Sequence, residues 1–534
     1  MTKKRLTVAI VLIVTLCVLM TVAVGFLVWQ LFILEKHEDK SMEMNISRST
    51  FVETARDPAA PEKDALYSRI YGALTDERGN FLDISDLLGK PALLFFWSSW
   101  CGDCKAFFDD GFSRMTEAAK ITGMPVLLIC REGIRGDNVV SARKALADHS
   151  ISMPLYMDSD AMIYKQTGLN EVPGIAVLNA DGLLVYTSSD MPDADQVNSM
   201  YEYASQGPTA QTDTLLRSMI KQDGSLSSGF SITGLELIQT TTYLSETQGL
   251  IMQYALLDSN ARLFDSAYSY AKETLDKNNL FSWQHNKGRK ERVNASLDDL
   301  RMISLLTAAA NDRYKAEARD RAAALYDAAV RNGVMRDFVD LDSSKVTNQV
   351  TLCYQDITAM KAAAYVDVRW LEVAESAEMI LAGGLISEEF PLYYPAYDAD
   401  SKQYIRKSLQ MNEAMLTVLN AARAGIIETK TLDWLEKTLN QGPLYAAYQV
   451  DGTVVEGYRF ESTATYALIV QTGIIVDRPE LTRLALSRME SIRCFEPPYV
   501  GGYGQITDEY HYSFDILQAA IALKHLSLED LETK

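Results

Sequence analysis

Two cysteines three positions apart have the spacing of a thiol–disulfide site. Cys101 and Cys104 follow an apolar run from Ala92 to Trp97 and enclose Gly102 and Asp103. At the end of a buried strand and the start of a helix, the first sulfur lies at the helix N-terminus, where the helix dipole and free backbone N–H groups stabilise its thiolate. The pattern therefore predicts a redox-active dithiol.

The metal-binding alternative for this pair is a zinc half-site. A structural zinc ion takes four Cys or His ligands, and no second close Cys or His pair completes the set in this sequence. We therefore expect no metal and no other cofactor. The carboxylate of Asp103 disfavours a second negative charge, which predicts a higher thiolate pKa and a weaker oxidant. Cys130, which ends another apolar run, is interpreted as a buried hydrophobic residue.

Acidic residues that open helical patterns form a second group of candidates. Hydrolysis of a glycosidic bond needs two carboxyl groups, one protonated to donate to the leaving oxygen and one ionised to activate water. Glu246 opens one pattern, Asp298 and Asp299 open another, and Glu461 opens a third. In a barrel of helix pairs the inner helices point the same way, so acids at their N-termini meet at one mouth. The sequence therefore predicts a hydrolytic site there.

Other interpretations of these acids stay open. Ser296 and Asp299 also match a capping box, and any acid in a first helical turn is favoured by the helix dipole. Asp398 and Asp400 are alternative candidates for the base. The same two acids resemble a cation site, but a pair this short does not specify one.

Three aromatic residues are candidates for stacking on sugar rings. Trp283, Tyr394 and Tyr397 lie in or near the segments that carry these acids. Packing in the aromatic core is the alternative role for each of them.

An α/β domain is predicted to position the dithiol. Short apolar runs bounded by Gly, Pro and Asp alternate with helix-like stretches, which indicates buried strands. The runs are Ala92 to Trp97, Pro125 to Cys130, Ile175 to Leu178 and Leu183 to Tyr186. We place this domain at residues 64–190.

An all-α domain at residues 212–534 is predicted to position the acids. It has few β-branched runs and many apolar patterns of helical period. Helices are expected at residues 246–257, 264–276, 297–310, 316–331, 357–365, 375–381, 409–424, 463–470 and 513–525. Because no fixed-period repeat is present, a closed barrel of helix hairpins is favoured over an open superhelix.

The N-terminus carries a predicted membrane anchor at residues 1–35. The uncharged run from Thr7 to Leu34 is longer than the roughly 20 residues that a spanning helix needs. Lys3, Lys4 and Arg5 precede it, so the N-terminus is expected in the cytoplasm and the rest outside the cell. A cleaved signal peptide is the alternative, but the apolar run is too long for one.

Composition narrows the remaining possibilities. The chain has 534 residues with a formal net charge of -20, which argues against nucleic acid as a partner. Its hydrophobic fraction of 48% is that of folded domains, so a multidomain protein is expected. Polar segments at residues 36–63 and 191–211 are predicted to be linkers.

Residues 65–190 resemble the membrane-anchored thioredoxin-like proteins related to those of cytochrome c maturation. The resemblance rests on the segment 89–104, on Val172-Pro173 and on the turn at residues 179–182. It implies that Cys101 is the attacking thiol and Cys104 the resolving one. It also implies that Pro173 lies in a cis-proline loop that pairs with substrate peptide.

Residues 212–534 resemble glycoside hydrolase family 8, whose members are (α/α)6 barrels, or six-hairpin glycosidases. The matching segments, in order, are Ser245-Glu246-Thr247-Gln248-Gly249, residues 279–283, Ala295-Ser296-Leu297-Asp298-Asp299 and residues 510–515. The resemblance implies that Glu246 is the general acid and that Asp299 holds the sugar at the cleavage subsite. Glu461 stands where the family has an aspartate as catalytic base, and Thr247 and Leu250 also depart from its pattern.

Taken together, the sequence predicts a single-pass membrane protein in which an extracellular, inverting glycosidase is joined to a thiol–disulfide redox domain. Its expected partners are a polysaccharide, membrane lipid and a thiol-bearing protein. Trp283, Asp298, Tyr397 and Asp398 are expected to contact sugar. One alternative is a disulfide reductase whose helical domain only binds carbohydrate, and another is a surface scaffold in which neither site turns over.

Overall fold

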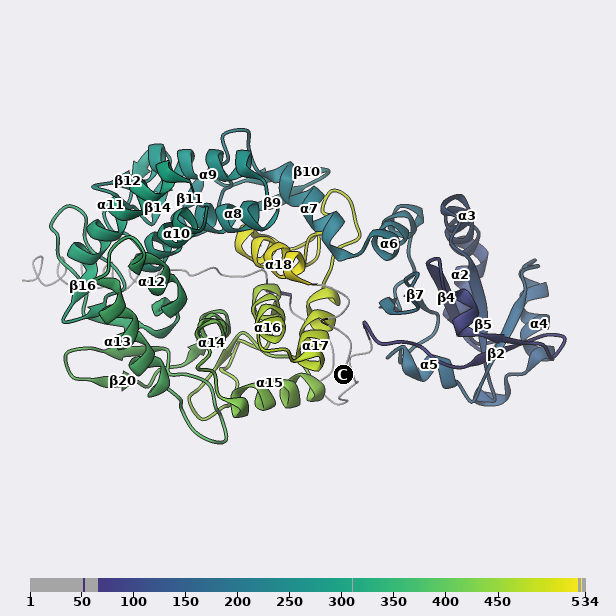
Figure 1. Cartoon of the computed structure of the whole chain (residues 1–534). Coiled ribbons are helices and arrows are strands. Elements are labelled where there is room, and N and C mark those ends of the chain that lie inside the picture. The colour runs from purple at the N-terminus through teal and green to yellow at the C-terminus, as the bar shows by residue number, and fades with distance from the viewer. Residues whose placement is uncertain (1–50, 53–65, 310, 527–529, 531–534) are drawn as a thin grey trace, which may run out of the picture. The chain divides into compact units, whose positions relative to one another are not determined.

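The computed structural model describes residues 51–52, 66–309, 311–526 and 530, which belong to one compact unit spanning residues 49–534 (Figure 1). The predicted membrane span, residues 7–34, and most of the first predicted linker lie outside the described residues. Within the part that is described, no helix is both long enough and apolar enough to cross a bilayer.

A seven-stranded mixed sheet forms the first domain, with strand order β3-β2-β6-β5-β4-β7-β8. The strands are β2 (Ala73–Asp76), β3 (Phe81–Asp83), β4 (Ala92–Trp97), β5 (Val126–Glu132), β6 (Leu155–Ser159), β7 (Gly174–Leu178) and β8 (Leu184–Ser188). Strand β4 is buried along its whole length and runs parallel to β5 and antiparallel to β7. A buried strand of six apolar residues matches the run that the sequence singles out.

Helices surround this sheet, as the predicted α/β class requires. They are η1 (Ile84–Leu87), α2 (Gly102–Asp110), α3 (Phe112–Thr122), η2 (Ile134–Gly136), α4 (Val139–Asp148), α5 (Met162–Gln166) and α6 (Ala194–Gln206). Helix α6 contacts α3 and buries Val197, Met200 and Tyr203 at helical spacing. The second predicted linker is therefore mostly an amphipathic helix, whose polar outer face resembles the composition of a linker.

Six inner helices form a closed ring in the second domain. They are α8 (Ser245–Leu257), α10 (Ser296–Ala308), α12 (Ile357–Ala364), α14 (Met411–Ala424), α16 (Thr463–Ile475) and α18 (Ser513–His525). Each contacts the next, and α18 contacts α8, so the ring closes as predicted (Figure 1). Five of them match predicted helices closely, and α16 continues beyond its expected end.

Six outer helices pack around this ring. They are α7 (Pro208–Met219), α9 (Ala261–Thr274), α11 (Asp312–Ala329), α13 (Trp370–Ala382), α15 (Thr429–Gln441) and α17 (Pro479–Glu490). The sequence did not predict α7, α15 or α17. In α15 only Thr431, Leu432, Leu435 and Leu439 are buried, and so narrow an apolar stripe gives a weak signal.

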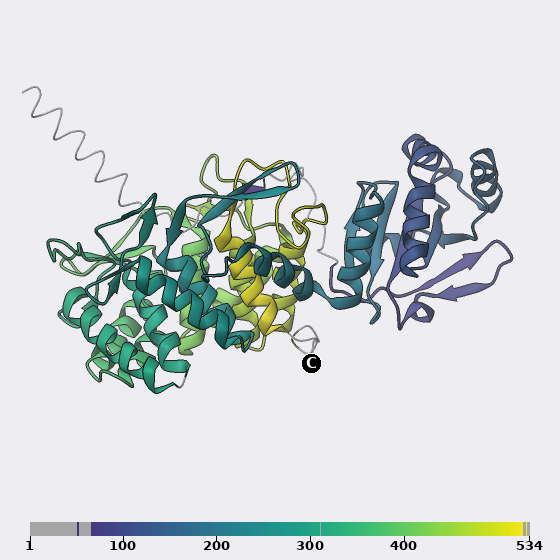
Figure 2. The ribbon, with the colours of Figure 1, turned by 90° about the horizontal axis from the view of Figure 1, so that it is seen from above.

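Short strands lie between the helices, gathered at one end of the barrel (Figure 2). Strands β11, β21, β23 and β24 each end directly before an inner helix, so this end carries the inner helices' N-termini. The remaining short elements are β1 (Phe51–Val52), β9 (Gly229–Thr233), β10 (Glu236–Gln239), β11 (Thr242–Leu244), β12 (Asp276–Lys277), β13 (Leu280–Phe281), β14 (Gln284–Asn286), β15 (Arg289–Lys290), β16 (Val330–Arg331), β17 (Val334–Met335), β18 (Gln349–Thr351), η3 (Leu352–Tyr354), β19 (Ala396–Asp398), β20 (Gln403–Ile405), β21 (Leu409–Gln410), β22 (Ala447–Tyr448), β23 (Glu461–Ser462) and β24 (His511–Tyr512).

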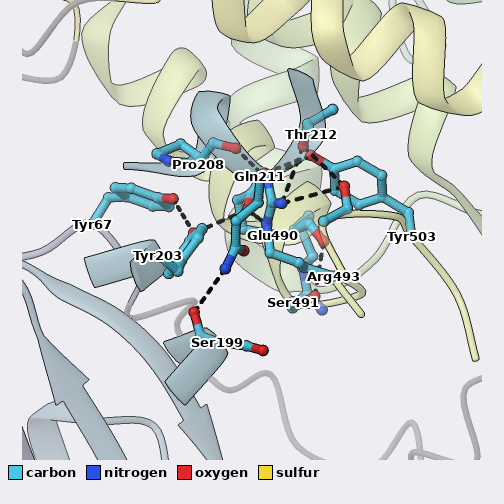
Figure 3. A network of polar contacts seen from close by, with 12 residues as sticks. Tyr67, Ser199, Tyr203, Pro208, Gln211, Thr212, Glu490, Ser491, Arg493 and Tyr503 are labelled. Atoms are coloured by element: carbon cyan, nitrogen blue, oxygen red, sulfur yellow. Dashed lines mark hydrogen bonds and ion pairs between the residues drawn. The ribbon is translucent and has the colours of Figure 1, made fainter. Parts of the chain in front are cut away.

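A buried polar network connects α6 with the chain that follows α17 (Figure 3). Glu490 and Arg493 form an ion pair whose side chains are both fully buried. The hydroxyls of Tyr203 and Tyr503 each donate to Glu490 at 2.9 Å, and the hydroxyls of Tyr67 and Tyr203 lie 2.5 Å apart. Because every charge in the network has partners, its burial is tolerated, whereas removing one partner costs about 3–5 kcal/mol.

Candidate functional site

The two redox cysteines lie where a strand passes into a helix. Cys101 is the N-cap of α2 and Cys104 is in its first turn, and the two form a disulfide. The backbone N–H of Cys104 donates to Cys101 Sγ at 3.0 Å. The helix N-terminus thus offers a hydrogen-bond donor to the very sulfur that becomes the thiolate when the disulfide is reduced.

The loop that contains Pro173 lies against this disulfide. The Val172–Pro173 peptide bond is cis, and the carbonyl oxygen of Val172 is 3.3 Å from Cys101 Sγ. The structure therefore brings together Cys101, Cys104 and Pro173, which the sequence had assigned to one site.

Trp100 directly precedes Cys101 and is exposed. The guanidinium carbon of Arg135 lies 4.3 Å from the centre of its ring, and that of Arg131 lies 5.9 Å away. Cys130 is fully buried, and burial raises the pKa of its thiol. This agrees with its interpretation as a hydrophobic residue, since a buried neutral thiol is unreactive.

Glu246 is the second residue of inner helix α8 and is buried, with 8% of its surface exposed. Within the described part of the chain, no hydrogen bond to its carboxyl group is recorded. Burial raises its pKa, the charge of Asp298 raises it further, and Arg301 acts in the opposite direction. A carboxyl group in such a place is protonated at neutral pH and suited to donate a proton.

Asp298, in the first turn of α10, is the carboxylate beside Glu246. It accepts hydrogen bonds from the Ser245 hydroxyl at 2.6 Å and from Arg301 at 2.8 Å. Gly249 provides the space for Arg301, because a Cβ at that position would lie 3.2 Å from Arg301 Cδ. Ser245 and Gly249 thus help to position Asp298, the first by a hydrogen bond and the second by leaving space for Arg301.

Asp299 faces a different set of partners from Asp298. One of its oxygens accepts from the Phe281 backbone N–H and the other from the Asn294 amide, both at 2.8 Å. Burial raises its pKa to about 8 despite these bonds. Both oxygens are therefore engaged by the protein, which joins residues 281 and 294 to the start of α10.

Glu461 lies in β23, directly before inner helix α16. It is 3% exposed, and the hydroxyl of Tyr466, a fully buried side chain of α16, donates to it at 2.5 Å. Its negative charge raises the pKa of that tyrosine, after burial as the first cause. One oxygen of Glu461 thus contacts the wall of the barrel.

Asp337 and Glu413 are two further acids that the sequence did not single out. Asp337 is buried, accepts from the Thr351 N–H and hydroxyl at 2.7 Å, and has its pKa raised by burial to about 7. Glu413 is the third residue of α14 and is partly exposed. Burial raises the pKa of the Cys353 thiol, and the charges of Glu413, Asp337 and Glu246 raise it further.

The signal that could have found Glu413 is the one used for Glu246. It is an acid in the first turn of a helix that the sequence predicts at residues 409–424. Asp337 follows a two-residue strand and has no comparable sequence signal.

The predicted sugar-contacting residues lie at the same end of the barrel. The carbonyl of Trp283 accepts from the Ser245 N–H at 3.0 Å, next to Glu246. The ring of Tyr397 lies 5.1 Å from that of Tyr404. Asp398 holds a turn by accepting from the Ser401 N–H at 2.7 Å, which keeps its pKa low, and Asp400 is 3.9 Å from Arg336.

Known proteins resemble both domains. Residues 71–187 match the AhpC/TSA family. ResA, a thiol-disulfide oxidoreductase of Bacillus subtilis, is 23% identical over 21% of this chain and 60% of its own. The "Putative lipoprotein YdaJ" of Bacillus subtilis is 26% identical over 54% of this chain and 81% of its own.

Among solved structures, an α-amylase from Clostridium perfringens is 25% identical, with a TM-score of 0.55 over 60% of this chain and 97% of that one. Family 8 glycosyl hydrolases also match, with TM-scores of 0.41 and 0.42. The predicted resemblance of the first domain to thioredoxin-like proteins is confirmed, and the second domain has the fold of the α-amylase.

Proposed function

We propose that this chain is a membrane-anchored, extracytoplasmic glycoside hydrolase that cleaves a polysaccharide and carries a thiol–disulfide redox domain. The observation that carries the proposal is Glu246, a buried carboxyl group beside the carboxylate of Asp298, at the end of a closed helical barrel. Burying a carboxyl group without a hydrogen-bond partner costs free energy. Such groups are therefore found mainly at functional sites.

Glu246 is the general acid in this account. Its raised pKa keeps the proton available for the leaving glycosidic oxygen, and general acid catalysis contributes typically 10²–10⁴-fold to rate. Asp298, held by Ser245 and Arg301, positions the sugar next to it. Trp283, whose carbonyl accepts from the first residue of α8, offers an aromatic ring for stacking on the sugar. Tyr397 and Asp398 extend the sugar-binding surface.

The base that activates water is one of two glutamates. Glu461 is the candidate from the family resemblance, and one of its oxygens accepts from the Tyr466 hydroxyl. Glu413 is the other candidate, because it lies in the first turn of inner helix α14, as Glu246 does in that of α8. An inverting mechanism requires that the base lie roughly 6.5–9.5 Å from the acid, against about 5–5.5 Å in a retaining enzyme.

Asp299 is better suited to a positioning role than to contact with substrate. Because both of its oxygens accept bonds from the protein, we propose that it orders the loop at residues 281–294, which carries Trp283.

The surface location rests on the apolar run at residues 7–34 and on the basic residues before it. YdaJ, which has the word lipoprotein in its name, supports attachment to a membrane in this group of proteins. The α-amylase match supports a carbohydrate substrate without specifying its linkage.

A second candidate function is thiol–disulfide exchange by a chain whose helical domain only binds carbohydrate. The observation that favours it is the disulfide at the start of α2, next to the cis proline. Cys101 attacks a disulfide of the partner, a mixed disulfide forms, and Cys104 then displaces the partner as a dithiol while the Cys101–Cys104 bond re-forms.

Hydrolysis by a Glu246→Gln variant separates the two candidates. Reducing ends are measured after incubation with α- and β-linked glucans and bacterial exopolysaccharides, with Glu378→Gln on the outer helix α13 as the control. We expect a loss of about 100-fold or more for Glu246→Gln and no loss for the control. If the wild-type chain binds a glycan but cleaves none in the panel, the binding role replaces the hydrolase.

A further inference from the structure

A polar pocket lies between the inner helices of the barrel. It has a volume of about 210 Å³ and is lined by residues of all six inner helices, among them Gln253, Arg301, Asp356, Arg423 and Gln471. On this scale a cavity of about 10–15 Å³ holds one water molecule. The space is therefore large enough for a small polar molecule.

This pocket adjoins the acid end on one side of the ring, because on α10 and α12 its lining begins at Leu297 and Thr358, the second residue of each helix. On α8, α14, α16 and α18 its lining begins at the sixth helical residue or later, for example at Leu250, Leu416 and Leu468. Glu246 and Glu413 are the second and third residues of their helices. On these four helices the lining thus begins about one helical turn beyond the level of Glu246 and Glu413.

Positive charge predominates in the lining. Arg301 is paired with Asp298 at 2.8 Å. Arg423 donates to the amide oxygen of Gln471 at 3.3 Å, and among the described residues it has no recorded ion pair with a carboxylate. Asp356 is the one acid in the lining, and it already accepts from the Ala359 N–H at 2.9 Å.

The two arginines repel each other across the cavity. Burial lowers the pKa of Arg423, the charge of Arg301 lowers it further, and Asp356 opposes both. A guanidinium group has five N–H donors, so a single bond of 3.3 Å leaves most of the bonding capacity of Arg423 to whatever fills the cavity.

We propose that this cavity binds a small oxyanion between Arg423 and Arg301. Arginine presents paired N–H donors that match a carboxylate or phosphate group, and such charge-assisted bonds strengthen away from bulk water. The amides of Gln253 and Gln518 supply further donors. The anionic group belongs either to a free inorganic ion or to a carboxylated sugar.

Isothermal titration of the full chain with inorganic phosphate, sulfate and glucuronate tests the site. We expect one binding event per chain, weakened at least 10-fold in Arg423→Gln. Lys144→Gln, on α4 of the first domain, changes the net charge equally and is expected to bind as wild type does. Tighter binding of phosphate and sulfate indicates a free ion, and tighter binding of glucuronate indicates a sugar acid.

Far-UV circular dichroism shows whether Arg423→Gln folds. If it does not, two further variants test the site. Arg423→Lys keeps the charge but loses the paired donors, and Ser304→Leu fills part of the cavity; both are expected to weaken binding. Absence of binding by all three anions, or equal binding by wild type and the folded Arg423 variants, overturns the site. The titration needs no hydrolysis, so its outcome is distinct from that of the proposed activity.

Discussion

The dithiol and the carboxylate group differ in how much of the fold each needs. Cys101 and Cys104 are both placed by one strand-to-helix junction. Glu246, Asp298 and Glu413 come from three different helices, whose N-termini the ring brings to one end of the barrel. A site that one local junction carries can be recognised from residue spacing. A distributed site, whose residues come from several helices as these acids do, can be recognised only through its fold.

The largest loss of activity is expected at the dithiol, the site that one strand-to-helix junction carries. Cys101→Ser should abolish insulin-disulfide reduction, with a loss of more than about 100-fold, because the attacking thiolate is gone. Cys104→Ser should instead trap mixed disulfides through Cys101, which non-reducing gels detect. Hydrolysis by both variants should stay at the wild-type level. If Cys104→Ser traps nothing and Cys101 is alkylated no faster than Cys130, the redox role is wrong.

The next effect concerns the base of the distributed site. We expect Glu413→Gln to reduce hydrolysis by about 100-fold, and Glu461→Gln to reduce it much less, because Glu461 contacts Tyr466 in the barrel wall. Added azide should restore activity only to a truncated variant of the true base, such as Glu413→Ala. The reverse ranking of the two glutamates would return the role of base to Glu461.

The smallest change in activity is expected to distinguish the roles of Asp298 and Asp299. Asp299→Ala leaves the Phe281 N–H and the Asn294 amide without their partner, so it should lower the free energy of unfolding by about 2–5 kcal/mol. Asp298→Asn should instead raise KM with a smaller loss of stability. Denaturant titration and steady-state kinetics of both variants measure this. Equal effects of the two changes on KM would place Asp299 in contact with substrate after all.

The extent to which sequence predicted each part follows from the same physics. Strand β4 and the cysteines were predicted because six apolar residues and a CxxC need no distant information. Glu246 was predicted because it opens a strongly apolar helix. By contrast, Asp298 and Asp299 are adjacent in sequence and differ only in direction, one toward Arg301 and the other toward Asn294. Their separate roles depend on tertiary partners that the local pattern does not contain.

Helix α6 shows the same limit at the level of elements. Its buried residues Val197, Met200 and Tyr203 are separated by polar ones, which made it resemble a linker. The hydroxyl of Tyr203 finds its partners in Tyr67 and Glu490, both far away in the chain. Only the folded structure identifies it as part of a buried network.

The protonation state of Glu246 is the most direct test of the account. Difference infrared spectroscopy of wild type minus Glu246→Gln at pH 6 isolates its carboxyl group. Because burial raises its pKa, this group should remain protonated at a pH where a glutamate with an ordinary pKa near 4.3 is ionised. We expect the carbonyl band of a neutral carboxylic acid, which disappears only as the solution becomes alkaline. A carboxylate band at pH 6 would contradict it, because Glu246 would then have no proton to donate.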